Sequence, residues 1–243
     1  MIKETNVEEI REITKLLLLV EPEPVAIMPF FVYHPIFESV MVAIKENDEN
    51  KFCNLNIPDE YDMIIDNYSK LIDTLSVMKC YILVRTAYKL TWVKYCKDFL
   101  SEKDFGEFLS MAWVDEENPN QDVNCSITYL TGLFQKCKKE HLMCKEDYEN
   151  YKKLPDKFIV YRGVAVGRNP HGLSWTLNLE TAQWFANRFN NDKETGYIEK
   201  ATVRKSDVFA YFNTRGEDEI VCNVSSKDII ILDKAEKIKK YHI

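Results

Sequence analysis

Three short groups of residues in the last third of the chain have the types and spacing that acid–base and electrostatic catalysis require. They are Arg162-Gly163, Ser174 with Thr176, and Glu217 with Glu219. Where a chain is extended, carboxylates two positions apart share one face, here with Asp218 opposite. Two carboxylates held close together push one pKa upward, which suits a general base. An arginine can hold an anion through two parallel hydrogen bonds, for which lysine is a poorer fit.

Each group also has an ordinary explanation when taken alone. An arginine at a strand end is usually solvated, Ser-x-Thr suits strands, and Glu-Asp-Glu is usually an exposed acidic turn. Other catalytic patterns are absent, because the chain has no P-loop, no Gly-x-Gly-x-x-Gly and no Gly-x-Ser-x-Gly. The 7 cysteines fit no standard zinc spacing, so we expect reduced thiols and no metal site.

The order of the three groups resembles mono-ADP-ribosyltransferases of the Arg–Ser–Glu type, found among arginine-directed bacterial toxins and phage-encoded transferases. The resemblance covers about residues 155–232, and Trp175 departs from the most familiar Ser-Thr-Ser form of the central motif. It implies a split β core that binds NAD⁺, as a substrate, in a cleft.

The resemblance assigns the two glutamates to catalysis. Cleavage of the nicotinamide–ribose bond passes through an oxocarbenium-like state, as in glycoside hydrolysis, so positive charge develops on the ribose. Glu219 would stabilise that charge more than the ground state and would hold a ribose hydroxyl. Glu217 would position or deprotonate the acceptor nucleophile.

The same resemblance assigns four residues to NAD⁺ binding. Arg162 would grip the pyrophosphate or ribose, and Gly163 would let the backbone approach the nicotinamide amide. Ser174 would orient Glu219 by a hydrogen bond, and Thr176 would support the same strand pair.

The segment before Glu217, residues 211–216, is the expected substrate loop. Tyr211 or Phe212 would stack on a guanidinium or a base, and Arg215 lies beside them. A place for one of the two aromatic residues in a strand core is an equally good interpretation. The Glu-x-Glu pair favours arginine as the acceptor, but the sequence leaves a protein or a nucleic acid acceptor open.

Composition predicts a globular α+β protein. The chain has 243 residues, 46% hydrophobic and 29% charged, with a net charge of −7. The charge is uneven, at −9 over residues 1–154 and +2 over the remainder. No basic stripe is present, which argues against broad affinity for nucleic acid.

The expected elements divide at residue 154. Residues 1–153 predict a helical N-terminal region, with a capping box at Thr5-x-x-Glu8 and helices near 37–45, 59–75, 77–99 and beyond. Residues 154–243 predict the ADP-ribosyltransferase-like catalytic core. Its strands are expected near 157–161, 172–176, 196–204, 207–212, 219–223 and 228–232, with one helix at 179–189.

Three functions follow from these observations. The leading one is an NAD⁺-dependent transferase acting as an intracellular toxin, defence or phage effector. The second is an NAD⁺ glycohydrolase, in which water replaces the acceptor. The third is a catalytically silent partner-binding module, in which the acidic helical region binds an antitoxin or another partner. No signal peptide or membrane-spanning run is present, so we expect a cytoplasmic protein without membrane contact.

Overall fold

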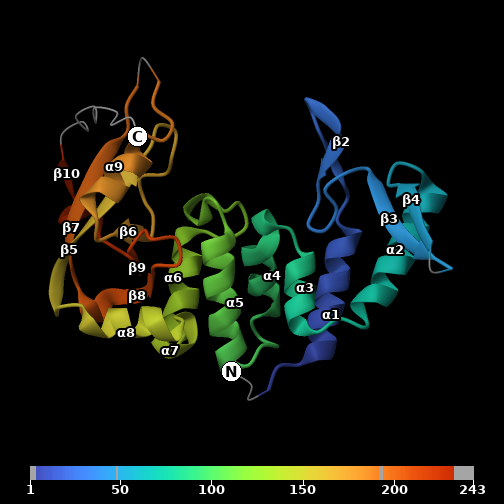
Figure 1. Cartoon of the computed structure of the whole chain (residues 1–243), viewed down its shortest axis with the longest axis horizontal. Coiled ribbons are helices and arrows are strands. Elements are labelled where there is room, and N and C mark those ends of the chain that lie inside the picture. Colours follow the sequence, from blue (N-terminus) through green and yellow to red (C-terminus); the bar gives the residue numbers. More distant parts are fainter. Residues whose placement is uncertain (1–3, 48, 192–193, 233–243) are drawn as a thin grey trace. The chain divides into compact units, whose positions relative to one another are not determined.

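The computed structural model describes residues 4–47, 49–191 and 194–232 (Figure 1). The chain forms two compact units, Met1–Glu117 and Asn118–Ile243. The expected domain boundary lay between residues 153 and 154, where strands replace helices. The helices at 127–153 instead belong with the strands that follow them, and the division falls in the polar stretch before Pro119.

The first unit contains five α-helices and two hairpins within its described residues. The helices are α1 (Val7–Leu16), α2 (Pro58–Ile72), α3 (Val77–Leu83), α4 (Lys89–Cys96) and α5 (Glu102–Asp115). The hairpins are β1 (Glu23–Val25) with β2 (Met28–Tyr33), and β3 (Met41–Glu46) with β4 (Glu49–Asn54). Short 3₁₀ turns lie at Leu17–Leu19 and Thr86–Tyr88.

The core of this unit is built around Trp92 of α4. Its ring lies 5.6 Å from that of Tyr81 and 5.2 Å from that of Phe108, centroid to centroid. The indole Nε1 donates to Thr14 Oγ1 of α1 at 2.9 Å, so the polar edge of the buried ring is satisfied. One aromatic cluster therefore joins α3, α4 and α5, and the hydrogen bond to Thr14 ties α1 to it.

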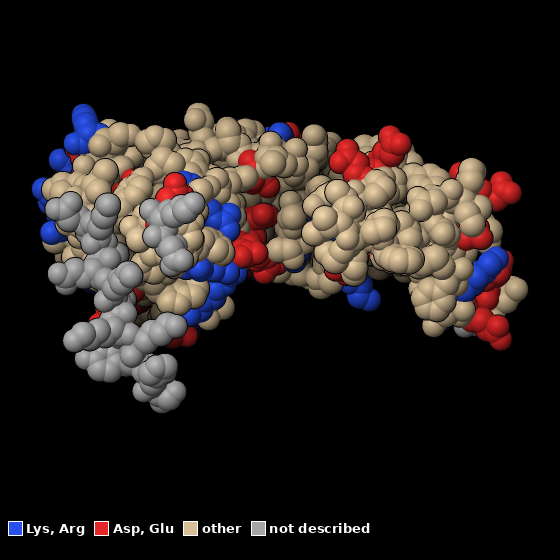
Figure 2. All heavy atoms as spheres, turned by 90° about the horizontal axis from the view of Figure 1, so that it is seen from above, with Lys and Arg blue, Asp and Glu red and all other residues tan. Residues whose placement is uncertain are grey.

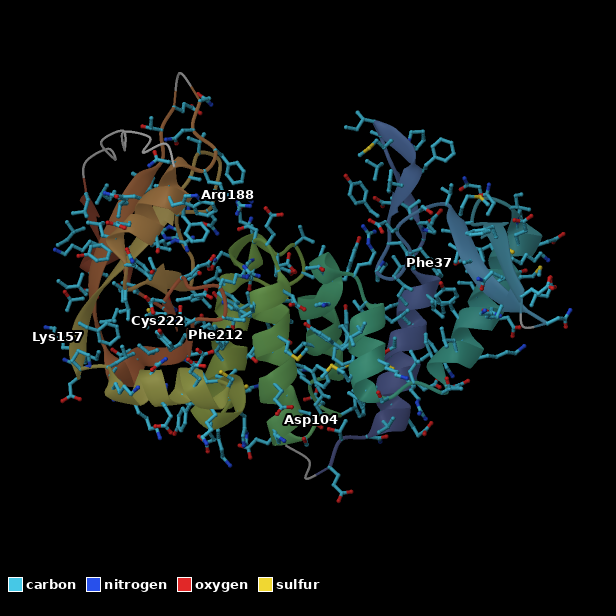
Figure 3. The ribbon with its side chains drawn as sticks, in the orientation of Figure 1. Phe37, Asp104, Lys157, Arg188, Phe212 and Cys222 are labelled. Atoms are coloured by element: carbon cyan, nitrogen blue, oxygen red, sulfur yellow. The ribbon has the colours of Figure 1, made fainter. Side chains whose placement is uncertain are left out.

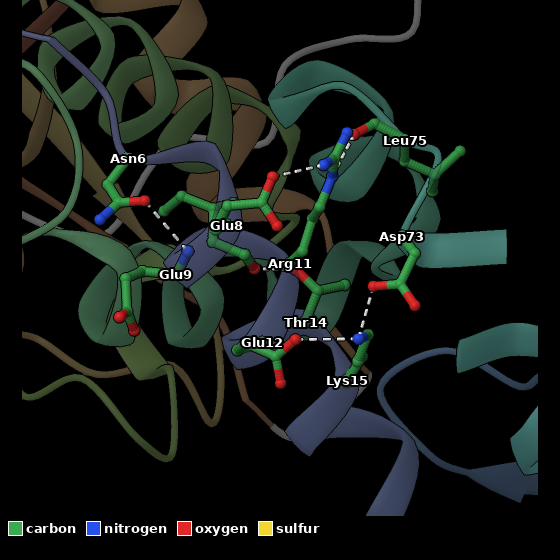
Figure 4. A network of polar contacts seen from close by, with 10 residues as sticks. Asn6, Glu8, Glu9, Arg11, Glu12, Thr14, Lys15, Asp73 and Leu75 are labelled. Carbon is green, nitrogen blue, oxygen red and sulfur yellow. Dashed lines mark hydrogen bonds and ion pairs between the residues drawn. The ribbon is translucent and has the colours of Figure 1, made fainter. Parts of the chain in front are cut away.

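One ion pair and one hydrogen bond tie α1 to the segment after α2 (Figure 4). Lys15 Nζ lies 2.8 Å from a Glu12 oxygen and 2.5 Å from a carboxylate oxygen of Asp73. Arg11 Nε donates to the carbonyl of Leu75 at 2.9 Å. The expected capping box is wrong in its cap residue, because Asn6, not Thr5, caps α1 by accepting from Glu9 N.

Two expected helices in this unit are wrong. The helix at 37–45 is strand β3, in which Val42 and Ile44 are buried and their neighbours exposed, a period of two rather than 3.6. The long helix at 77–99 is interrupted near Arg85. The Arg85 backbone N–H donates to Pro35 O at 2.8 Å, and its guanidinium donates to three carbonyls. Those contacts draw the chain out of helical geometry.

His34 is buried at the end of the β1–β2 hairpin. Its Nδ1 accepts from the backbone N–H groups of Ile36 and Phe37, both at 3.0 Å, and its ring stacks on that of Phe37, labelled in Figure 3. Burial lowers the pKa of His34 to about 4, from 6.5. The ring is thus neutral in the folded protein at neutral pH.

The second unit places helices α6 (Ile127–Lys136), α7 (Lys139–Leu142) and α8 (Lys145–Lys153) before a six-stranded antiparallel sheet. The strands are β5 (Lys157–Val164), β6 (Ser174–Thr176), β7 (Tyr197–Arg204), β8 (Val208–Phe212), β9 (Glu219–Cys222) and β10 (Ile230–Leu232). Helix α9 (Leu179–Asn187) follows β6, and 3₁₀ turns lie at Pro119–Gln121, Lys205–Asp207 and Ser226–Asp228. The α+β class is confirmed.

The sheet consists of two three-stranded halves. Its order is β10-β7-β5-β6-β9-β8, and β5 pairs with β6 through one residue pair, Tyr161 with Thr176. By contrast, β5 and β7 pair along eight residues. The two halves therefore meet at a narrow junction formed by β5 and β6.

Helix α9 packs on β5 and β7 (Figure 1), and its backbone lies against Gly163 of β5. A Cβ at Gly163 would lie 2.0 Å from Ala182 O and 2.5 Å from Ala186 N. The glycine is therefore required by helix packing, and its expected role in admitting nicotinamide has no support from this geometry.

The sequence predicts that positive charge is concentrated in the C-terminal part of the chain. On the face shown in Figure 2, Lys and Arg side chains lie mainly over the second unit. Among the described residues, none of the helices combines the length and hydrophobicity needed to cross a bilayer.

We expect a pH-dependent loss of stability from His34. Between pH 6.5 and 4 the unfolded chain binds a proton at this residue that the folded chain does not. The free energy of unfolding therefore decreases as the pH is lowered from 6.5 to 4, by roughly 2 to 3 kcal/mol. Urea unfolding at pH 7.5 and pH 4 measures the change in wild type and in His34→Asn, which keeps an acceptor but does not titrate. Equal pH dependence in the two proteins would contradict the assignment.

We expect Gly163→Ala to destabilise the second unit by about 3 kcal/mol, because the new methyl group meets the backbone of α9. Gly132→Ala is the matched control, since no atom lies within 4 Å of its Cβ position in α6. That control gains up to about 1 kcal/mol from helix propensity. Urea unfolding followed by circular dichroism measures both, and equal stability of the two variants would refute the packing role.

Candidate active site

Three of the residues expected to act together come from three different strands and meet at the junction of the two half-sheets. Arg162 of β5 donates through Nη1 to the carbonyl of Ser174 in β6 at 2.8 Å. The Ser174 hydroxyl donates to Oε1 of Glu219, the first residue of β9. The residues Arg162, Ser174 and Glu219, here called the junction chain, are thus linked by hydrogen bonds across the sheet.

Arg162 is buried, with 8% of its surface exposed. Its Nη2 donates to the carbonyl of Asn169 at 3.0 Å, and Gly172 lies against the guanidinium, where a Cβ would come within 2.4 Å of Nη2. Burial lowers the pKa of Arg162. In this structure Arg162 holds the segment 169–174 and strand β6, whereas the expected grip on a pyrophosphate would need an exposed guanidinium.

The segment between β5 and β6 is also held from the other side. Asn120, in the 3₁₀ turn at Pro119–Gln121, accepts through Oδ1 from Leu173 N at 2.7 Å. Its carbonyl accepts from Asn169 Nδ2 at 3.3 Å. The loop that leads to Ser174 is therefore fixed at both ends.

A buried carboxylate that sequence reasoning missed lies beside Arg162. Glu199 of β7 stands directly opposite Arg162 in the β5–β7 pairing and is 4% exposed. Its Oε2 lies 3.9 Å from Arg162 Nε. The sequence does indicate that Glu199 is buried, because it stands two and four positions before Ala201 and Val203 in a strand whose apolar residues alternate.

Thr176 supports the entry to β9. Its hydroxyl donates to the carbonyl of Glu217 at 2.6 Å and accepts from Asn178 N at 3.1 Å. It also stands opposite Glu219 in the β6–β9 pairing. Thr176 therefore fixes the backbone on which both glutamates lie.

Glu217 and Glu219 do not share one strand face, contrary to the expectation from the sequence. Strand β9 begins only at Glu219, and Asp218 has a left-handed backbone with φ of 48°. The Tyr211 hydroxyl donates to an Asp218 carboxylate oxygen, and Asn213 Oδ1 accepts from Asp218 N at 3.1 Å, which holds this conformation. The regular alternation of an extended strand therefore does not relate the two carboxylates.

Tyr211 and Phe212 do not offer a stacking surface to an acceptor. They belong to strand β8 and are 4% and 6% exposed; Phe212 is labelled in Figure 3. Phe212 pairs with Glu219 in the sheet, so its place is set by the strand register. Of the three side chains expected to meet the acceptor, Tyr211, Phe212 and Arg215, Arg215 alone is exposed, in the turn beside Gly216, whose φ is 70°.

The turn at 213–218 is anchored to α8. The buried Asp147 accepts through Oδ1 from Asn213 N at 3.2 Å, and Gly216 N donates to Asn213 O at 2.9 Å. Asp147 carried no signal in the sequence, because it is one of several charged residues in a polar helix.

A pocket of about 430 Å³ lies beyond Arg162 and Glu199 along the same two strands. It is lined by residues 164–168 at the end of β5 and residues 194–197 at the start of β7. The guanidinium of Arg168 lies 4.8 Å from the centroid of the Phe189 ring at this end of the sheet. The volume is in the range of small-molecule sites.

Within the described ranges, no group of three or more His, Cys, Asp or Glu side chains is placed to hold a metal ion. No protein-family model matches the chain, and neither a curated protein nor a solved structure matches it.

We expect Arg162→Lys to destabilise the second unit by about 3 kcal/mol. An ammonium group cannot donate to the Ser174 and Asn169 carbonyls in the same fork geometry, and hydrogen bonds from charged groups contribute about 1.5–3 kcal/mol each. Arg204→Lys, at an exposed position at the end of β7, is the control. The two free energies of urea unfolding decide the matter, and a loss below about 0.5 kcal/mol for Arg162→Lys would count against a positioning role.

Proposed function

We propose that this chain is an NAD⁺-dependent mono-ADP-ribosyltransferase. One observation carries the proposal. Arg162, Ser174 and Glu219, whose order in the sequence resembles the Arg–Ser–Glu type of this family, are joined by hydrogen bonds although they belong to three strands. The meeting of two three-stranded half-sheets at this point supports it, since the resemblance implies a split β core with NAD⁺ bound there.

The chemistry follows from the placement of Glu219. The bond between the ribose C1′ and the nicotinamide nitrogen breaks, and nicotinamide leaves as a neutral molecule with the bonding electron pair. The ribose then carries positive charge, which the Glu219 carboxylate stabilises. The hydrogen bond from Ser174 fixes the direction of that carboxylate, so it does not reorganise as the charge develops.

The acceptor completes the reaction by forming a new bond to C1′. Its nucleophilic atom loses a proton, and the resemblance assigns Glu217 as the general base that accepts it. A protein arginine is the acceptor that the Glu-x-Glu pair favours, and Arg215 is the exposed residue beside which it would bind. A nucleic acid acceptor gives the other outcome of the labelling experiment below.

The second candidate is an NAD⁺ glycohydrolase. The left-handed Asp218 favours it, because Glu217 is not fixed beside Glu219 by strand geometry. In that case water attacks C1′, the products are nicotinamide and ADP-ribose, and Glu217 is dispensable.

The cellular role we propose is that of an intracellular toxin, defence or phage effector. The acidic first unit would then bind a partner, such as an antitoxin or the acceptor. This part of the proposal rests on the family resemblance and on the charge difference between the two parts of the chain.

We expect Glu219→Gln to lower nicotinamide release from NAD⁺ by roughly 10²–10³-fold, because the neutral amide keeps the hydrogen bond but loses the charge. Glu180→Gln is the control, since Glu180 is exposed on α9.

A lysate with labelled NAD⁺ shows whether the label enters protein or nucleic acid. If the chain is a transferase, Glu217→Gln abolishes labelling of the acceptor but still releases nicotinamide. If it is a glycohydrolase, Glu217→Gln still produces both nicotinamide and free ADP-ribose. Wild-type protein that is folded and releases no nicotinamide would refute both functions.

A further inference from the structure

Glu199 lies outside the set of residues that the proposed reaction uses. It is 4% exposed, and its side chain lies on the same face of β7 as the buried apolar residues Ala201 and Val203. A carboxylate in such a place is unfavourable unless it has a charged or hydrogen-bonding partner. Its presence therefore calls for a physical reason.

The group opposite Glu199 is the guanidinium of Arg162. The two residues form a directly paired position of the β5–β7 ladder, so their side chains lie on the same face of the sheet. Within the described residues, Glu199 Oε2 and Arg162 Nε are both buried and have no hydrogen-bond partner, and 3.9 Å separates them. The pair is thus held by charge without a direct hydrogen bond between these two atoms.

The other end of the same guanidinium holds the active site. Nη1 and Nη2 donate to the carbonyls of Ser174 and Asn169, and Ser174 in turn donates to Glu219. Glu199 thus lies beside the Nε of the same guanidinium whose Nη1 and Nη2 reach the two carbonyls. Buried ion pairs contribute little net stability compared with apolar residues of the same size, so a role in geometry explains this one better than stability does.

We propose that Glu199 is a positioning residue of the active site, which fixes Arg162 and through it the Ser174–Glu219 pair. This inference rests on the proposed function for its effect on rate, but its effect on the segment 169–174 is independent of it. Burial raises the pKa of Glu199, and the neighbouring charges of Arg162 and His171 oppose that shift.

The test uses the full chain with two substitutions of different severity. Glu199→Gln removes the charge, and Glu199→Asp keeps the charge but draws it back by one methylene group. Glu180→Gln, an exposed position on α9, is the matched control. Two quantities are measured for each protein: kcat and KM for nicotinamide release from NAD⁺, and hydrogen exchange of peptides that cover residues 168–177.

Both substitutions at Glu199 are expected to lower kcat by about tenfold or more while KM changes less than about threefold, because a small misplacement affects the transition state most. Exchange over residues 168–177 is expected to quicken by about tenfold. Glu180→Gln is expected to match wild type in both measurements. If Glu199→Gln does not fold, Glu199→Asp decides the result.

Different results would overturn the positioning role of Glu199 and the proposed function. Wild-type kcat in both Glu199 variants would overturn the positioning role, whether or not exchange changes, while the proposed function would stand. Faster exchange in Glu199→Asp with no nicotinamide release by wild type would overturn the proposed function and leave Glu199 as the residue that fixes this segment.

Discussion

The second unit depends on the burial of one guanidinium. Arg162 belongs to β5, yet its donors reach the carbonyls of Ser174 and Asn169, and its charge faces Glu199 on β7. Because β5 and β6 share a single residue pair, these contacts do what a longer ladder of backbone hydrogen bonds would otherwise do. Gly172 leaves room for the guanidinium, and α9 closes the opposite face of the sheet on Gly163.

The sequence was most informative where chemistry and chain order coincide. Arg162, Ser174 and Glu219 were singled out by type and order, and the structure brings them into one hydrogen-bonded chain. The α+β class and the sequence positions of the C-terminal strands also followed from alternating apolar residues and from the turns between them. These features are local, so a single sequence contains the information for them.

The remaining features depend on contacts between distant parts of the chain. The expected face shared by Glu217 and Glu219 was lost because Tyr211 and Asn213 hold Asp218 in a left-handed conformation. Phe212 lies in the expected strand near 207–212, here β8, and its pairing with Glu219 excludes the alternative place in a substrate loop. Glu199 was missed because one charged residue within a strand has no meaning until its partner is known.

In the proposed reaction Ser174 acts through Glu219, and a double-mutant cycle on nicotinamide release measures that dependence. Ser174→Ala, Glu219→Gln and the double variant are compared with wild type at saturating NAD⁺. If Ser174 serves only to orient the Glu219 carboxylate, Ser174→Ala slows release and the double variant is no slower than Glu219→Gln alone. Full activity of Ser174→Ala, or losses that multiply in the double variant, would show that Ser174 does not act through Glu219.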